Sequence, residues 1–159
     1  MSKLVLIVCR GFAILLLPLL AFADGQTLHG YVSRIMDGDR LQVITREGAR
    51  YPVRLQGIAA PASDDRASAR ASKRSLEMLL AGKPVTLHYK RRDERGNILG
   101  TVTLGGMDAA LRQLERGMVR FSDTPTLDGD QRKRYRAAER QARERSMGLW
   151  KQRRSSWHR

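Results

Sequence analysis

The sequence predicts an α+β fold in which a five-stranded β-barrel carries three helices. Five short segments have the residue alternation of strands, and three longer segments have helical spacing with capping residues. No linker, repeat or low-complexity stretch separates these segments, and about 136 residues suffice for one core but not for two. We therefore expect residues 24–159 to form one domain.

Three strands are expected in the first third of this domain. Asp37-Gly38 is a hairpin signal between the first and second strands, and Glu47-Gly48 marks the turn between the second and third. The three strand-like segments are 28–36, 41–45 and 51–56.

A helix and two further strands follow. Ser63 can cap a helix whose first turn holds Asp64 and Asp65, which favours the helix dipole, and Gly82 ends it. In the next segment apolar and polar residues alternate from Pro84 onward, which predicts a strand with one buried face. These two strands are expected over 84–90 and 98–104.

Two helices complete the domain. Asp108 can cap a short helix that ends at Gly117, and a longer helix is expected over 130–147, ending before Gly148. Three strands, a helix, two strands and two helices is the element order of an oligonucleotide-binding (OB) barrel with added helices. A barrel of this kind offers a strand face and loops to an extended ligand.

The first 23 residues are typical of a secretory signal peptide. Lys3 and Arg10 supply a short basic region, 11–20 an apolar core, and a small-x-small cleavage site ends at Ala23. The apolar core is shorter than the roughly 20 residues of a transmembrane helix, so no stable membrane anchor is expected. We predict a secreted or periplasmic protein. An uncleaved anchor is the alternative, because Arg10 lies late and the apolar run can be extended toward the N-terminus.

The single cysteine, Cys9, lies inside this predicted signal peptide. The chain after cleavage would then hold no cysteine, which excludes a disulfide framework, a cysteine nucleophile and a thiolate zinc site. We expect a monomer that has no small-molecule cofactor.

The chain is strongly basic, with 30 Lys and Arg against 16 Asp and Glu and a pI near 11.1. Without Lys3 and Arg10 the counts are 28 against 16, a net charge of +12. Such a field attracts nucleic acid, anionic lipid headgroups or acidic glycans, with an affinity that falls as salt rises. Arginine greatly outnumbers lysine, so codon bias in a GC-rich genome is an alternative origin of the charge.

The segment from Asp37 to Ala62 carries a specific resemblance. An Asp37-Gly38-Asp39 turn is followed by YPVRLQGIAAPA over 51–62, and E-x-x-A and GLW motifs follow at 139–142 and 148–150. The sequence resembles the staphylococcal nuclease family, in which the turn reads DGDT, the third strand reads xVRLxGIDAPE, and the chain ends on the same two motifs. The resemblance covers residues 30–150.

This resemblance implies a site for phosphodiester hydrolysis in which calcium, held by carboxylates, and two arginines act on the phosphate. Asp39 stands at the family's metal-binding turn aspartate, and Arg54 at its strand arginine. Ala59 and Ala62 replace a second metal ligand and the acid assigned to water activation, and Asn97 replaces the second arginine. The resemblance thus implies a degenerate site, in which calcium binds weakly if at all.

Each retained residue also has a structural interpretation. Asp39 can satisfy backbone amides in its turn, and Arg54 can pair with Asp37 or Asp39. Asp64 and Asp65 follow the lost acids closely and could turn inward to replace them, although a place in the first turn of a helix explains them more simply.

The last predicted helix and the tail after it are one-sidedly basic. A solvated helix face is the ordinary explanation of such a run, yet it could also contact several phosphates. The candidate nucleic-acid-binding residues are Arg132, Lys133, Arg136, Arg140 and Arg143.

These observations predict an exported nuclease-like protein that binds nucleic acid or another polyanion and whose hydrolysis is weak or lost. One alternative is an active calcium-dependent endonuclease with a rebuilt site, acting on DNA or RNA. A second alternative is a cationic envelope protein with a structural or interaction role.

Overall fold

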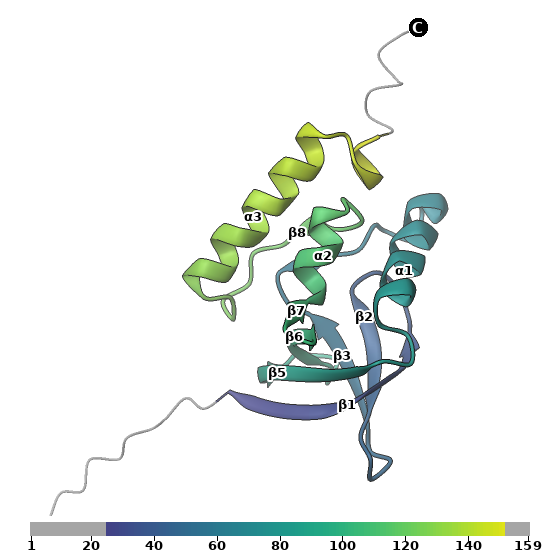
Figure 1. Cartoon of the computed structure of the whole chain (residues 1–159), viewed down its shortest axis with the longest axis vertical. Coiled ribbons are helices and arrows are strands. Elements are labelled where there is room, and N and C mark those ends of the chain that lie inside the picture. Colours follow the sequence, from purple (N-terminus) through teal and green to yellow (C-terminus); the bar gives the residue numbers. More distant parts are fainter. Residues whose placement is uncertain (1–24, 152–159) are drawn as a thin grey trace, which may run out of the picture.

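The computed structural model describes residues 25–151, which form a closed barrel with helices along one side (Figure 1). Neighbouring strands run antiparallel in the order β3-β2-β1-β5-β6, and a parallel pairing of β3 with β6, in which Val53 faces Ile98, closes the barrel. The expected five-stranded barrel is confirmed. Its strands are β1 (Gln26–Ile35), β2 (Arg40–Ile44), β3 (Arg50–Leu55), β5 (Pro84–Arg92) and β6 (Ile98–Leu104).

Three two-residue strands were not expected from the sequence, because two residues are too few to show a period. In two of them, Ile58 pairs with Phe121 and Ala59 with Arg120, which ties the segment after β3 to the segment before the last helix. The short strands are β4 (Ile58–Ala59), β7 (Met107–Asp108) and β8 (Arg120–Phe121).

The three expected helices are present, and a single 3-10 turn, η1 (Gly148–Trp150), follows the last of them. Asp108 caps the second helix as expected, because its carboxylate accepts hydrogen bonds from the backbone amides of Ala110 and Leu111. The helices are α1 (Arg66–Leu80), α2 (Ala109–Glu115) and α3 (Gly129–Glu144).

Two helix boundaries differ from the expectation. The N-cap of α1 is Asp65 and not Ser63, and its carboxylate accepts a hydrogen bond from the amide three residues later at 3.1 Å. Similarly, Asp128 caps α3. This helix ends at Glu144, before 147, because Ser146 adopts a left-handed backbone with φ of 51° that no helix can continue through.

The core lies between the barrel and the three helices. Tyr135 of α3 is fully buried in it, and its hydroxyl donates to the Asp108 carboxylate at 2.6 Å, so α3 is fixed to the N-terminus of α2. Other side chains without exposed surface include Leu41, Val43, Leu76, Leu80, Leu87, Ile98, Val102 and Leu114.

The predicted signal peptide and the basic tail after Lys151 lie outside the described residues. Among residues 25–151, no helix has the length and hydropathy needed to cross a membrane.

Candidate functional site

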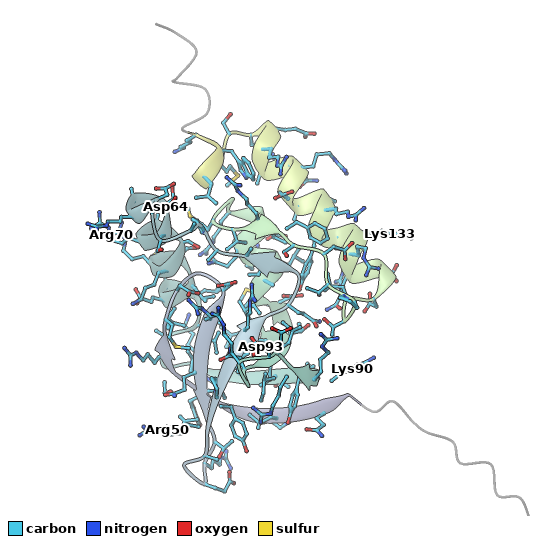
Figure 2. The ribbon with its side chains drawn as sticks, turned by 180° about the vertical axis from the view of Figure 1, so that it is seen from behind. Arg50, Asp64, Arg70, Lys90, Asp93 and Lys133 are labelled. Carbon is cyan, nitrogen blue, oxygen red and sulfur yellow. The ribbon has the colours of Figure 1, made fainter. Side chains whose placement is uncertain are left out.

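An open cleft is lined by the turn before β2, by β3 and the loop after it, and by the β5–β6 turn. Figure 2 shows one of its residues, Asp93, near the middle of the face in view. Nine charged side chains line the cleft, and positive charges exceed negative ones by one. They are Arg40, Arg54, Arg91, Arg92 and Arg95 with Asp37, Asp39, Asp93 and Glu94.

The turn that carries Asp39 is held from behind by α1 and α2. The buried amide nitrogen of Gln113 donates to the carbonyl oxygen of Gly38 at 3.2 Å and to that of Ser72 at 3.1 Å. Its amide oxygen accepts from Ser75 at 2.6 Å. Gly38 lies so close to Ser72 that any β-carbon would overlap the serine hydroxyl. Glycine is therefore required where the turn meets α1.

Asp37 organises the front of this turn. One carboxylate oxygen accepts from the Asp39 amide at 3.1 Å, and the other accepts from Nε of Arg40 at 2.6 Å. Burial alone would raise the pKa of Asp37, but hydrogen bonds from Asp39 and Arg40 hold it below its ordinary value. Asp37 is therefore ionised at neutral pH and committed to a guanidinium.

Asp39 is only 5% exposed, and Nε of Arg54 lies 3.5 Å from its carboxylate. Burial, together with the neighbouring Asp37, raises the pKa of Asp39 to about 7, although the charge of Arg54 and the amide of Ala60 oppose the shift. Arg54 thus pairs with one of the two aspartates considered from the sequence. At neutral pH a substantial fraction of the Asp39 carboxyl groups carries a proton.

Arg40 and Arg54 stand opposite each other in the β2–β3 register, so their side chains leave the same face of the sheet. Both side chains are 44% exposed and line the cleft. Arg40 was not among the site residues expected from the sequence, although a signal was present. The hairpin turn is centred on Glu47, and residues equally distant from the centre of a hairpin pair with each other.

At the two positions where the family has acids, this chain has alanines, which offer no side-chain oxygen to a metal ion or a water. Ala62 lines the cleft, and Ala59 lies in β4 directly before the cleft residue Ala60. Asn97 donates its side-chain amide to Asp93 at 2.9 Å, which closes the β5–β6 turn. Asn97, at the position of the family's second arginine, therefore stabilises the β5–β6 turn. Three arginines in and beside this turn line the cleft: Arg91, Arg92 and Arg95.

Asp64 and Asp65 do not replace the lost acids. Asp65 caps α1, and Asp64 accepts a hydrogen bond from the Asp65 amide at 2.9 Å. Neither residue lines the cleft, and Figure 2 shows Asp64 beside α1, well away from Asp93. The structure therefore does not support the hypothesis of a site rebuilt from these two residues.

The cleft does not fit calcium, which prefers six to eight oxygen ligands. Within residues 25–151, no three His, Cys, Asp or Glu side chains are placed to hold one ion together. Asp37 is engaged by Arg40, and Asp39 has a pKa of about 7 and Arg54 beside it. The guanidinium groups of Arg40 and Arg54 therefore lie beside Asp37 and Asp39, where a calcium ion would need further carboxylates.

The candidate binding residues on α3 fall into two groups. Arg132 and Arg136 both contact Asp123, at 2.8 and 3.0 Å, and so hold α3 to the segment after β8. Lys133 and Arg140 are exposed and form no ion pair within the part of the chain that the structure describes. Figure 2 shows Lys133 on the outer edge of the molecule.

The fifth candidate on α3, Arg143, is also used inside the fold. It pairs with Glu139 at 3.0 Å, and its guanidinium lies 4.3 Å from the ring centre of the buried Trp150. Glu139 in turn accepts a hydrogen bond from the Phe121 amide at 2.9 Å. Arg120 of β8 also lies over Trp150, 5.8 Å from its ring centre. Glu139 and Trp150, one from each motif, therefore connect the C-terminal half of α3 to β8.

Comparisons with known proteins agree with this architecture. The profile of the family described as staphylococcal nuclease homologue matches residues 52–152. The chain is 32% identical over 129 residues to an uncharacterized endonuclease of Escherichia coli, covering 77% of each protein. It is 27% identical over 161 residues to the probable endonuclease LCL3 of Pyricularia oryzae, covering 81% of this chain and 63% of that protein. This chain belongs to the staphylococcal nuclease homologue family.

Proposed function

We propose that this chain is an exported member of the family that binds nucleic acid or another polyanion and hydrolyses phosphodiesters weakly or not at all. The observation that carries the proposal is the composition of the cleft. The cleft keeps Arg54 and adds further arginines, but alanine stands at 62 in its lining and at 59 directly beside it, where the family has acids.

The arginines support binding. Half-exposed guanidinium groups form charge-assisted and often bidentate hydrogen bonds with phosphate or carboxylate oxygens. Arg54 keeps its Asp39 partner while nearly half of its side chain faces the cleft. On α3, Lys133 and Arg140 remain available for phosphate contacts outside the cleft.

The alanines argue against efficient catalysis. Hydrolysis of a phosphodiester requires an oriented water, a base and preorganised positive charge, and loss of each component typically costs a factor of about 10² to 10⁴. Methyl groups at 59 and 62 can neither bind a metal nor orient a water. Asp39 already interacts with Arg54, Asp37 and the Ala60 amide, so it cannot replace both of the missing acids.

A second candidate function is an active endonuclease, as the names of the relatives say of those proteins. One observation favours it: a carboxyl with a pKa near 7 is matched to general-base work at neutral pH, and Asp39 has such a pKa. In that case Asp39→Asn would remove the residual activity.

A degradation assay separates these functions. Residues 24–159 would be incubated with plasmid DNA and with RNA in calcium, magnesium or chelator. We expect turnover at least about a thousandfold below that of an intact family member. Rapid, chelator-sensitive digestion would instead establish the endonuclease.

Binding is measured in parallel by retention of labelled single- and double-stranded oligonucleotides. We expect retention at low salt, little sequence preference, and log affinity that falls linearly with log salt. Failure to retain either strand form at low salt would favour the structural envelope role. Export is tested by cell fractionation and N-terminal sequencing, with Asp24 expected as the first residue of the exported protein.

A further inference from the structure

The two arginines that face each other across β2 and β3 form a paired cationic surface. Like charges directly opposite in a sheet are destabilising, and here each guanidinium has an aspartate beside it. Arg40 binds Asp37 at 2.6 Å, and Arg54 lies 3.5 Å from Asp39. The aspartates offset the repulsion and also fix the two guanidinium groups on the cleft side.

Most of the donors on this surface remain available. A guanidinium carries five N–H donors. In Arg40, Nε and one terminal nitrogen contact Asp37. In Arg54, only Nε lies near a carboxylate, and its two terminal nitrogens have no hydrogen-bond partner among the described residues. Adjacent planar donors of this kind suit a tetrahedral anion, because each can bind two oxygens at once.

We propose that Arg40 and Arg54 form a phosphate clamp that binds the anionic ligand without any divalent metal ion. The inference rests on the proposed function and describes how the same cleft would hold its ligand. The fourth position of the turn, threonine in the family's DGDT, is Arg40 in this chain. Its permanent positive charge lies beside the turn carboxylates where the family's calcium would supply charge, and it repels a second cation there.

The test uses residues 24–159 and a fluorescein-labelled single-stranded thymidine oligonucleotide, with affinity measured by fluorescence anisotropy at low salt. Affinity in chelator and in millimolar calcium should agree within about twofold, since no bridging ion is required. Arg40→Gln should weaken binding about tenfold, the scale of one charge-assisted hydrogen bond. The affinity of Arg40→Lys should lie between those of the unaltered protein and Arg40→Gln, because lysine keeps the charge but not the planar donors.

The matched control is Arg50→Gln, which removes the same charge from an exposed arginine. Figure 2 shows Arg50 near the lower edge of the molecule, apart from Asp93 at the middle of the view. This variant should change affinity by less than about twofold, because Arg50 does not line the cleft and would make no direct contact with a ligand bound there. Thermal melting of each variant checks folding, and Arg40→Lys retains a cation beside Asp37 if the glutamine variant is unstable.

The outcomes are distinguishable. Binding that chelator abolishes would overturn metal independence but leave polyanion binding standing. Equal effects of Arg40→Gln and Arg50→Gln would overturn the clamp while the cleft or α3 could still bind. Absence of binding under both conditions would remove the proposed function itself, and the clamp with it.

Discussion

Gly38 determines how closely the carboxylate turn lies against α1. A β-carbon at this position would overlap the hydroxyl of Ser72 and approach its β-carbon to 2.9 Å, so α1 or the turn would have to move. Such overpacking typically costs about 1–3 kcal/mol. We expect Gly38→Ala to lower the free energy of unfolding by that amount, measured by urea denaturation.

Ser72 supplies the control for this prediction. Its hydroxyl is buried and has no hydrogen-bond partner within the described residues, so Ser72→Ala removes an unsatisfied group and should be close to neutral. The double variant should recover part of the stability that Gly38→Ala removes. Additive effects in the double-mutant cycle would contradict the direct contact.

Asp39 gives the fold a characteristic pH dependence. Its pKa rises from 3.8 to about 7 on folding, so the native state binds a proton more tightly than the unfolded state does. Below about pH 4 the carboxyl is protonated in both states, and ionisation has no effect on stability. Between about pH 4 and pH 7 the unfolded state loses this proton more readily than the native state does, so the free energy of unfolding falls as pH rises.

Asp39→Asn should therefore stabilise the protein at pH 8 by roughly 1–3 kcal/mol and have little effect at pH 4. Urea denaturation across this range measures the difference. Asp93→Asn is the control, and it should destabilise the protein at pH 8. Burial raises the pKa of Asp93, but hydrogen bonds from Asn97 and backbone amides outweigh this effect and lower it overall. A stabilisation by Asp39→Asn that is equal at both pH values would contradict the assigned titration.

At the scale of the element, α3 separates charges that support the fold from charges that face solvent. Replacing Lys133 and Arg140 with glutamine should leave the melting temperature within about 2 °C, since exposed charges contribute little to stability. The same change should reduce the slope of log affinity against log salt by about one for each phosphate that the variant no longer neutralises.

The matched pair is Arg136 and Arg143, which contact Asp123 and Glu139 and lie over Phe121 and Trp150. Glutamine at both positions should lower the melting temperature, because it removes ion pairs and cation–π interactions that hold α3 to the rest of the fold. Equal melting temperatures for the two double variants would show that these interactions contribute nothing. An unchanged salt slope in the first variant would exclude the outer face of α3 as a binding surface.

For the whole molecule, the composition of the cleft predicts weak calcium binding. With few carboxylates available, the dissociation constant should be about a millimolar or weaker, as measured by isothermal titration calorimetry. Ala59→Asp combined with Ala62→Glu supplies the two acids of the family motif, and this variant should bind calcium more tightly and degrade plasmid DNA in a chelator-sensitive way. Micromolar calcium affinity of the unaltered protein would contradict this prediction.

The sequence by itself determined the barrel, its three helices and the family. Alternation along the strands, the Asp37-Gly38 and Glu47-Gly48 turns and the Asp108 cap are local features, and each depends on residues a few positions apart. The replacement of acids by Ala59 and Ala62 is equally visible in the sequence, because the motif around them is contiguous.

Only the tertiary structure decided which charges act together. Gln113 of α2 fixes a turn 75 residues earlier in the chain, and Asp123 binds Arg132 and Arg136 of α3. Whether an arginine faces solvent or a partner depends on contacts between distant elements, and no local pattern contains them. The two-residue strands and the α3 boundary were missed for the same reason, because long-range pairing and a left-handed residue override local propensity there.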